Sequence, residues 1–397
     1  MEPLPMLNLA PAEVASRCRH LPGMVFFDTA LDGANGDAVS LIAAEPATVL
    51  TGRADADWAA LRDAVAARQS FAAGWVDYEG EFCFGFYDKL LGYNHRNGTW
   101  FSVGGAGAEW AGWLARADEA IDPLLCFAPT MQRAEFLRIV ARAKDYIAAG
   151  DIYQVNLSHR FTAPWEAGEP FAFYRALRRA SPAPHAAFLA LDGRTVLSSS
   201  PELFLKISGR RIATRPIKGT RPRRSDPVAD ASSAEELVSS PKEIAELIMI
   251  TDLERNDLGQ VCEFGSVAVT ELLKLERFEQ VFHLVSTVEG RLRPEVDPVT
   301  ALRACFPGGS ITGAPKKRAR EIIAELEPEA RGLYTGAIGY FGFNEESQFN
   351  IAIRTVVIEN GAAHFHVGAG IVADSQPEQE WQETLDKAAG ILLAAKS

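Results

Sequence analysis

The chain has 397 residues, of which 47% are hydrophobic and 23% are charged. This composition suits a globular protein with a core large enough for one or two domains, and it excludes a mostly disordered chain. The formal net charge of −12 argues against general affinity for nucleic acid or for an anionic membrane. Five widely spaced cysteines without a CxxC pair, together with no signal peptide and no long apolar run, predict a cytoplasmic protein with reduced thiols.

The N-terminal residues 1–118 alternate short apolar runs with glycine-rich breaks. This pattern predicts strands and hairpins, with helices at 10–20 and 57–69. Another helix is expected at 131–149, where Gly150 ends it. We interpret 1–118 as an N-terminal part that packs on the remaining chain within a single domain.

Longer strands are expected after this helix. The stretch DIYQVNLSHRFTA (151–163) alternates as a strand does. AAFLALDG and RTVLSSSPELFLKISG are predicted to be two further strands joined at Asp192-Gly193, which is a typical hairpin turn. The polar stretch 224–236 predicts a mobile loop.

Three strands are predicted near the C-terminus, at 334–343, 348–359 and 361–373, and the last two meet at the turn Asn360-Gly361. A final helix is expected from 376 to 395. Long strands separated by few amphipathic helices favour an α+β fold with large antiparallel sheets.

One predicted helix begins with Ser240 as N-cap and Pro241 at its first position. Glu243 and Glu246 are three residues apart, so they share one face of this helix. The last helix repeats the spacing with Glu380 and Glu383, followed by Lys387.

Two such acid pairs on separate helices would suit one Mg²⁺ ion, which prefers carboxylate oxygens and water. Each pair alone has a structural explanation. Glu243 occupies the position of a capping-box acid after Ser240, and Glu383 can form an ordinary helix ion pair with Lys387.

The segment FPGGSITGAPKKRAREIIAEL places three glycines before a predicted helix that starts at Pro315. Such a turn presents free backbone N–H groups to an anion, and a carboxylate is a reasonable guest. A plain strand–turn–helix connection explains the stretch equally well.

An arginine stands in the predicted strand FNIAIRTVVIEN. Arg354 has small and apolar neighbours, so it needs a partner, either a carboxylate of a ligand or an acid of the protein. In the next strand, Gly368 to Gly370 are small residues that let a ligand or another backbone come close.

These stretches together resemble the chorismate-utilising enzymes. The matching motifs, in order, are SSSPELF, PIKGTRPR, ELIMITDLERNDLG, HLVSTVEG, FPGGSITGAPK, IAIRTV and GAGIVADSQPEQEWQETLDK. The resemblance covers 125–395 strongly and the N-terminal part more loosely. It implies one domain of two large antiparallel sheets packed face to face, with helices outside.

The resemblance also implies a site for chorismate. It places Mg²⁺ on Glu246 and Glu383, with Glu243 and Glu380 beside them, and it places the ring carboxylate of chorismate on that metal. Further positions match residues that hold the substrate, chiefly its enolpyruvyl carboxylate: Tyr334, Arg354, Gly370 and Lys387, with Ser310 and Thr312 in the glycine-rich turn.

Two positions distinguish branches of the family. Gln154 stands where the water-using members carry a base lysine, which argues against water as the nucleophile. Lys218, in PIKGT, resembles the branch that aminates chorismate at C4, the aminodeoxychorismate synthases. Arginines on both sides are expected to favour the neutral amine of this lysine.

The implied mechanism has two displacements. The amine of Lys218 adds at C2 of the ring while the C4 hydroxyl leaves, and ammonia then adds at C4 and expels the lysine. Glu202 resembles the acid/base that assists loss of the hydroxyl, and His283 is expected near the ring. Without the resemblance, Glu202 would be a strand-end charge and His283 a core histidine, and Lys218 can also act as a charge without forming an adduct.

No segment resembles a glutamine amidotransferase, so ammonia is expected from a separate glutaminase subunit. Two other functions stay open: anthranilate synthase component I, and a non-catalytic chorismate-binding protein. The N-terminal part of family members can bind tryptophan, and SLIAAEPATVL (40–50) lies where part of that site is expected.

Overall fold

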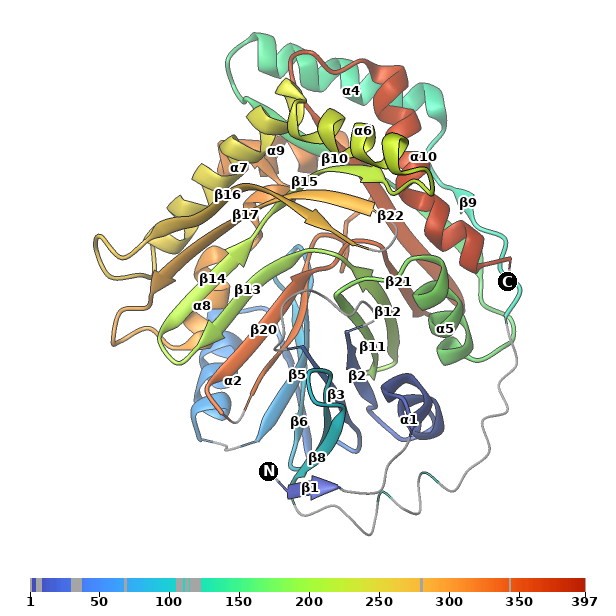
Figure 1. Ribbon diagram of the computed structural model, residues 1–397, viewed down its shortest axis with the longest axis vertical. Helices are drawn as coiled ribbons and strands as arrows, with labels where there is room; N and C mark the ends of the chain where they lie inside the picture. Colours follow the sequence, from blue (N-terminus) through green and yellow to red (C-terminus); the bar gives the residue numbers. More distant parts are fainter. Residues whose placement is uncertain are drawn as a thin grey trace.

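Two antiparallel β-sheets form the centre of the molecule, and helices cover their outer faces (Figure 1). The computed structural model describes residues 2–4, 9–29, 38–67, 70–104, 110, 114, 123–278, 281–342 and 344–396. Within these residues one sheet has twelve strands and the other has ten. The predicted α+β fold with large antiparallel sheets is confirmed.

The twelve-stranded sheet combines early and late parts of the chain. Its strands in spatial order are β1 (Glu2–Leu4), β8 (Thr99–Val103), β7 (Leu90–Asn94), β3 (Val39–Ala43), β2 (Val25–Asp28), β11 (His185–Leu191), β12 (Arg194–Ser200), β21 (Thr355–Glu359), β22 (Ala362–Ile371), β10 (Gln154–Pro164) and β18 (Gly313–Ala314), with β9 (Ala128–Pro129) beside β10.

The ten-stranded sheet also combines early and late parts of the chain. Its strands in spatial order are β15 (Ile217–Pro222), β17 (Val281–Arg291), β14 (Arg211–Arg215), β13 (Leu203–Ser208), β20 (Glu346–Ile351), β19 (Ala337–Phe341), β5 (Phe71–Val76), β6 (Phe82–Tyr87) and β4 (Thr48–Gly52), with β16 (Ala268–Arg277) beside β17. The stretch 40–50 runs from β3 in the first sheet to β4 in the second.

Helices lie between and after these strands. They are α1 (Pro11–Cys18), α2 (Asp55–Ala67), α4 (Arg133–Ala148), α5 (Pro170–Ala180), α6 (Pro227–Val238), α7 (Pro241–Gly259), α8 (Pro298–Cys305), α9 (Lys316–Leu326) and α10 (Pro377–Ala394), and a 3-10 turn, η1, spans Gly309–Ile311. No helix in the described ranges is both long enough and apolar enough to cross a membrane. All five cysteines are free.

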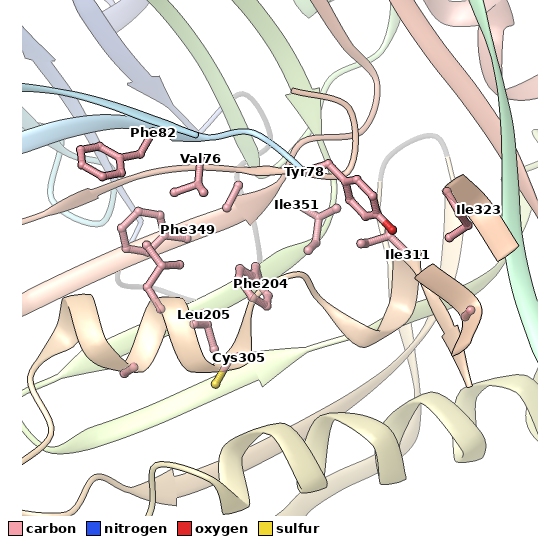
Figure 2. Close-up of a cluster of buried hydrophobic side chains, with 14 of the residues drawn as sticks. Val76, Tyr78, Phe82, Phe204, Leu205, Cys305, Ile311, Ile323, Phe349 and Ile351 are labelled. Atoms are coloured by element: carbon pink, nitrogen blue, oxygen red, sulfur yellow. The ribbon is translucent and has the colours of Figure 1, made fainter. Parts of the chain in front are cut away.

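Central strands such as β5 and β6 are buried on both faces, which explains their continuous apolar runs. In β5, Phe71, Ala73 and Trp75 pack into a cluster that joins the two sheets. Ala72 and Val76 point to the opposite face of β5 and pack in a larger cluster with α2, α4, α8 and α9. Figure 2 shows side chains of that larger cluster, with residues of several strands above the end of α8. A third cluster packs α1, α5 and α10 on the twelve-stranded sheet.

The chain crosses between the sheets several times, and two of these crossings carry predicted site residues. β12 lies in the twelve-stranded sheet and β13 in the ten-stranded sheet, with Pro201 and Glu202 between them. β20 and β21 are likewise in different sheets, with 352–354 between them. The predictions of one strand over 194–209 and one over 348–359 were therefore wrong. Proline cannot donate to a strand ladder, and the Arg354 backbone turns to φ 49°, outside the β region.

The prediction of a loop at 224–236 was also wrong, because α6 occupies most of it. The Asp226 side chain accepts a hydrogen bond from the Ala229 N–H at 2.8 Å and caps the helix. Pro227 takes the first helical position, and Leu237 is completely buried. The polar composition of the segment suggested a loop, but the segment forms a short amphipathic helix that packs on β15 and β17.

Candidate active site

Two of the crossings between the sheets, β12 to β13 and β20 to β21, bring Glu202 and Arg354 into one region. The Ile351 N–H donates to the Glu202 carbonyl oxygen at 3.1 Å, so the two crossings lie side by side. The Arg354 carbonyl oxygen accepts from the Ser199 N–H at 3.1 Å. A left-handed backbone at a non-glycine residue costs free energy, and such strain is typical of binding sites.

Arg354 is a half-buried residue, and burial of its guanidinium lowers its pKa without any carboxylate in the described ranges opposing the shift. A buried cation without an anionic partner is costly. The mid-strand position predicted for Arg354 was wrong, but the structure leaves its guanidinium available for the carboxylate of a ligand.

Lys218 lies on β15 opposite Leu284 of β17. Its Nζ donates to the Ser310 carbonyl oxygen at 3.4 Å. The following residue, Gly219, sits at a β-bulge with φ 70°, a conformation that favours glycine and redirects the neighbouring side chain.

The surroundings expected for Lys218 were wrong. The arginines of the segment pair elsewhere, Arg221 with Glu243 at 3.7 Å and Arg223 with Asp230 at 2.9 Å. Three acids lie near enough to the lysine to feel its charge, which opposes the rise in their pKa values that burial causes. These acids are Glu202, Glu246 and Glu383.

Glu202 and His283 both lie near Lys218. Glu202 is 6% exposed, and burial raises its pKa, while the Ser310 hydroxyl, Lys218 and Lys387 oppose that rise. The His283 Nδ1 lies 3.0 Å from the Thr220 hydroxyl. Burial and the nearby Arg354 lower the pKa of His283 to about 4, so the ring is neutral at physiological pH.

The four predicted metal-binding acids lie where α7 and α10 approach each other. Three of these acids form ion pairs with two lysines. Lys242 Nζ is 3.6 Å from Glu380 Oε1 and 4.0 Å from Glu246 Oε1. Lys387 Nζ is 2.7 Å from Glu383 Oε1. Glu380 is 2% exposed, so it is not an ordinary surface charge.

In the described ranges, no three acidic, histidine or cysteine side chains form a cluster that could hold a metal ion. Mg²⁺ commonly takes only one or two carboxylates and completes its shell with water and substrate oxygens. The Glu380 Oε2 atom is buried without a hydrogen-bond partner. A hard cation would satisfy this oxygen, so the residues present fit Mg²⁺.

Glycines of β22 let neighbouring side chains approach its backbone closely. A Cβ atom at Gly370 would lie 2.7 Å from Gln154 Nε2 and 4.0 Å from Glu246 Oε2. A Cβ atom at Gly368 would lie 2.7 Å from the Tyr334 hydroxyl oxygen. Lys387 Nζ donates to the Gly368 carbonyl oxygen at 2.8 Å. Tyr334 and Lys387 therefore meet at one glycine.

The glycine-rich turn already holds a carboxyl group of the protein. The Gly309 N–H donates to Glu254 Oε1 at 2.9 Å. Thr312 is completely buried, and its hydroxyl donates to the Gly308 carbonyl oxygen at 3.1 Å, so it braces the turn. Ser310 has a buried hydroxyl without a hydrogen-bond partner and faces Glu202.

The sequence analysis missed Lys242, Glu254 and Arg331. Lys242 lies one residue before Glu243 in PKEIAELI. This position could have predicted a positive charge near the acid pairs. Glu254 stands in TDLERND and Arg331 in EPEARGLY. Both resemble surface charges in sequence but are 2% exposed, and no local pattern signals their burial.

A pocket of about 960 Å³ opens beside α9, with Asp257, Lys316 and Arg331 among its lining residues. The predicted site residues all lie in the described ranges, and none of them lines this pocket.

Comparison with known proteins decides the family. The family model of chorismate binding enzymes matches residues 43–393. The chain belongs to this family. It is 48% identical over 263 residues to anthranilate synthase component 1 of Geobacillus stearothermophilus, a match that covers 66% of this chain and 52% of that protein. It is 46% identical over 262 residues to aminodeoxychorismate synthase component 1 of Bacillus subtilis, covering 66% and 56%.

The chain spans about half the length of these two curated relatives. The crystal structure of anthranilate synthase component I from Streptococcus pneumoniae superposes with a TM-score of 0.79 at 31% identity, covering 89% of this chain and 92% of that chain. The menaquinone-specific isochorismate synthase of Escherichia coli gives a TM-score of 0.82 at 19% identity, covering 99% and 93%. The second likeness shows the fold alone, and both agree with the single α+β domain.

Proposed function

We propose that this protein aminates chorismate at C4 to give 4-amino-4-deoxychorismate, as component I of aminodeoxychorismate synthase in p-aminobenzoate and folate biosynthesis. The observation that supports the proposal is Lys218, whose amine donates to the Ser310 carbonyl oxygen at 3.4 Å and whose charge acts on Glu202, Glu246 and Glu383. A glutamine amidotransferase subunit supplies the ammonia. We place the protein in the cytoplasm, where free thiols persist.

The substrate is held through its two carboxylates. Arg354 takes the enolpyruvyl carboxylate, assisted by Tyr334, the Gly370 backbone and Lys387, because a guanidinium binds a carboxylate in a bidentate manner. Glu246 and Glu383 would hold Mg²⁺, with Glu243 and Glu380 beside them. The ion supplies positive charge for the ring carboxylate.

The reaction runs in two displacements. Lys218, after giving its proton to a neighbouring carboxylate, forms a bond from Nζ to C2, and the C4–oxygen bond breaks. Glu202 gives the departing hydroxyl a proton, so water leaves, and burial suits this residue to carry the proton. Ammonia then bonds to C4 and the C2–Nζ bond breaks. The net reaction consumes ammonia, releases water and keeps the enolpyruvyl group.

Anthranilate synthase component I is the second candidate, because sequence identity does not separate the two activities: 48% to one relative and 46% to the other. The test is product identification by mass spectrometry with chorismate, Mg²⁺ and excess ammonium. An aminated product that retains the enolpyruvyl group supports the proposal, and Lys218→Ala should abolish its formation. Anthranilate with free pyruvate would refute the assignment to C4.

A further inference from the structure

Two buried ionisable residues hold the glycine-rich turn at its two ends. Glu254, on α7, accepts from the Gly309 N–H through Oε1 at 2.9 Å. Arg331 donates from Nη1 to the Ile311 carbonyl oxygen at 3.2 Å, and its guanidinium also pairs with Glu327 at 2.7 Å. Ser310 is the residue between these two anchor points.

Ser310 contacts Lys218 and lies near Glu202, the two groups that the proposed reaction uses. Its carbonyl oxygen accepts from Lys218 Nζ at 3.4 Å. Its buried hydroxyl is near enough to Glu202 to lower the pKa of that acid. A shift of the turn would therefore displace Ser310 relative to both Lys218 and Glu202.

Glu254 approaches the turn from the helix side. A Cβ atom at Gly309 would lie 2.7 Å from Leu253 Cδ2 and 3.2 Å from Glu254 Oε1, so α7 and the turn pack without spare room. Glu254 is 2% exposed, and its second oxygen, Oε2, has no hydrogen-bond partner. A buried, unpartnered carboxylate oxygen is costly when charged and less so in the neutral acid.

The groups around Glu254 favour its neutral form. Asp257 is 1% exposed and its Oδ2 pairs with Lys316 Nζ at 2.5 Å. Burial and the charge of Asp257 raise the pKa of Glu254 to about 8, Lys316 and the Gly309 N–H oppose the rise, and Glu202 adds to it. Buried Cys305 completes the surroundings, with its Sγ 3.7 Å from the Asp257 carbonyl oxygen.

We propose that Glu254 is a positioning residue: its buried carboxyl group, together with Arg331, fixes the turn so that Ser310 sits correctly between Lys218 and Glu202. Glu254 itself touches no reacting atom. The inference rests on the proposed function only in taking Lys218 and Glu202 as the reacting groups.

Three variants test this role. Glu254→Gln keeps an acceptor oxygen for the Gly309 N–H but cannot ionise. Glu254→Met has similar length and fills the space but removes the carboxyl acceptor. Glu236→Gln changes an exposed acid on α6 and serves as the control. For each folded variant, kcat and KM for chorismate are measured with free ammonium between pH 7 and 9.

We expect Glu254→Met to lower kcat roughly 10- to 100-fold, since a misplacement of about 1 Å can cost that much, with KM changed less than about threefold. Glu254→Gln should restore kcat near the wild-type value at pH 7. Its kcat relative to that of wild type should also change across this pH range, because burial and the charge of Asp257 raise the pKa of Glu254 and glutamine cannot ionise.

The proposal is overturned if Glu254→Met matches the Glu236→Gln control, or if Glu254→Gln is as impaired as Glu254→Met. If Glu254→Met does not fold, Glu254→Gln decides alone, and a kcat at pH 7 more than about 10-fold below the wild-type value overturns the proposal. If the wild type makes anthranilate, the assignment to C4 fails but this comparison stands, because each variant is measured against wild type on the same product.

Discussion

Lys242 Nζ lies 3.6 Å from Glu380 Oε1 and so joins α7 to a buried acid of α10. The same ammonium is 4.0 Å from Glu246. A lysine of the protein thus partly neutralises the acids that we assign to the neighbourhood of Mg²⁺, and lysine and metal ion would compete for their charge.

Lys242→Met should therefore alter stability and metal affinity in opposite directions. Without Mg²⁺ the free energy of unfolding should fall by about 1 kcal/mol, a small value because the lysine is half exposed. Mg²⁺ should bind more tightly, since cation repulsion is removed. Calorimetry measures the dissociation constant, and Lys274→Met, at an exposed ion pair with Glu271, is the control. Unchanged or weaker Mg²⁺ binding would contradict the competition.

Glu383→Ala should lower Mg²⁺-dependent turnover by roughly 100-fold or more, because it removes a proposed ligand. A Mg²⁺ titration of activity and of thermal unfolding checks this. Glu378→Ala on the same helix is the matched control, since Glu378 is exposed and pairs with Arg133. Near-normal activity of Glu383→Ala at low Mg²⁺ would refute the metal assignment.

Arg354→Met should stabilise the protein and weaken substrate binding. The buried guanidinium lacks a carboxylate partner in the described ranges, so replacing it by an apolar side chain should raise the free energy of unfolding by about 1 kcal/mol. The lost charge-assisted bonds should weaken chorismate binding roughly 10- to 100-fold. Urea unfolding and equilibrium binding test the two halves separately. A destabilised variant would mean that Arg354 has a structural partner.

Acidification from pH 6.5 to 4 should destabilise the protein. Burial lowers the pKa values of His159 and His185 to about 4. The unfolded chain binds protons at the ordinary histidine pKa, so on acidification it gains protons before the folded state does. The free energy of unfolding therefore decreases as the pH is lowered through this window. Each such histidine contributes a slope of up to about 1.4 kcal/mol per pH unit.

His159→Phe isolates one of these contributions. The histidine ring stacks on Trp381 at 4.7 Å, and phenylalanine preserves that stacking while removing the titration. Urea unfolding at several pH values should show a shallower slope for the variant. An unchanged slope would mean that His159 does not titrate differently in the folded and unfolded states.

Local signals in the sequence determined many of the elements correctly. Asp192-Gly193 and Asn360-Gly361 form the predicted hairpin turns, with positive φ at all four residues. The Ser240 side chain accepts from the Glu243 N–H, and α7 begins at Pro241 as predicted. These features depend on interactions between residues a few positions apart, so the local sequence is sufficient to predict them.

Only the tertiary structure decided which sheet each strand joins. RTVLSSSPELFLKISG has continuous strand character, yet its halves pair with β21 in one sheet and β20 in the other. This division places Glu202 beside the crossing that carries Arg354. Likewise, the carboxyl group at the glycine-rich turn comes from Glu254, 55 residues earlier in the chain. Long-range pairing and burial set these relationships, and residue spacing carries little information about either.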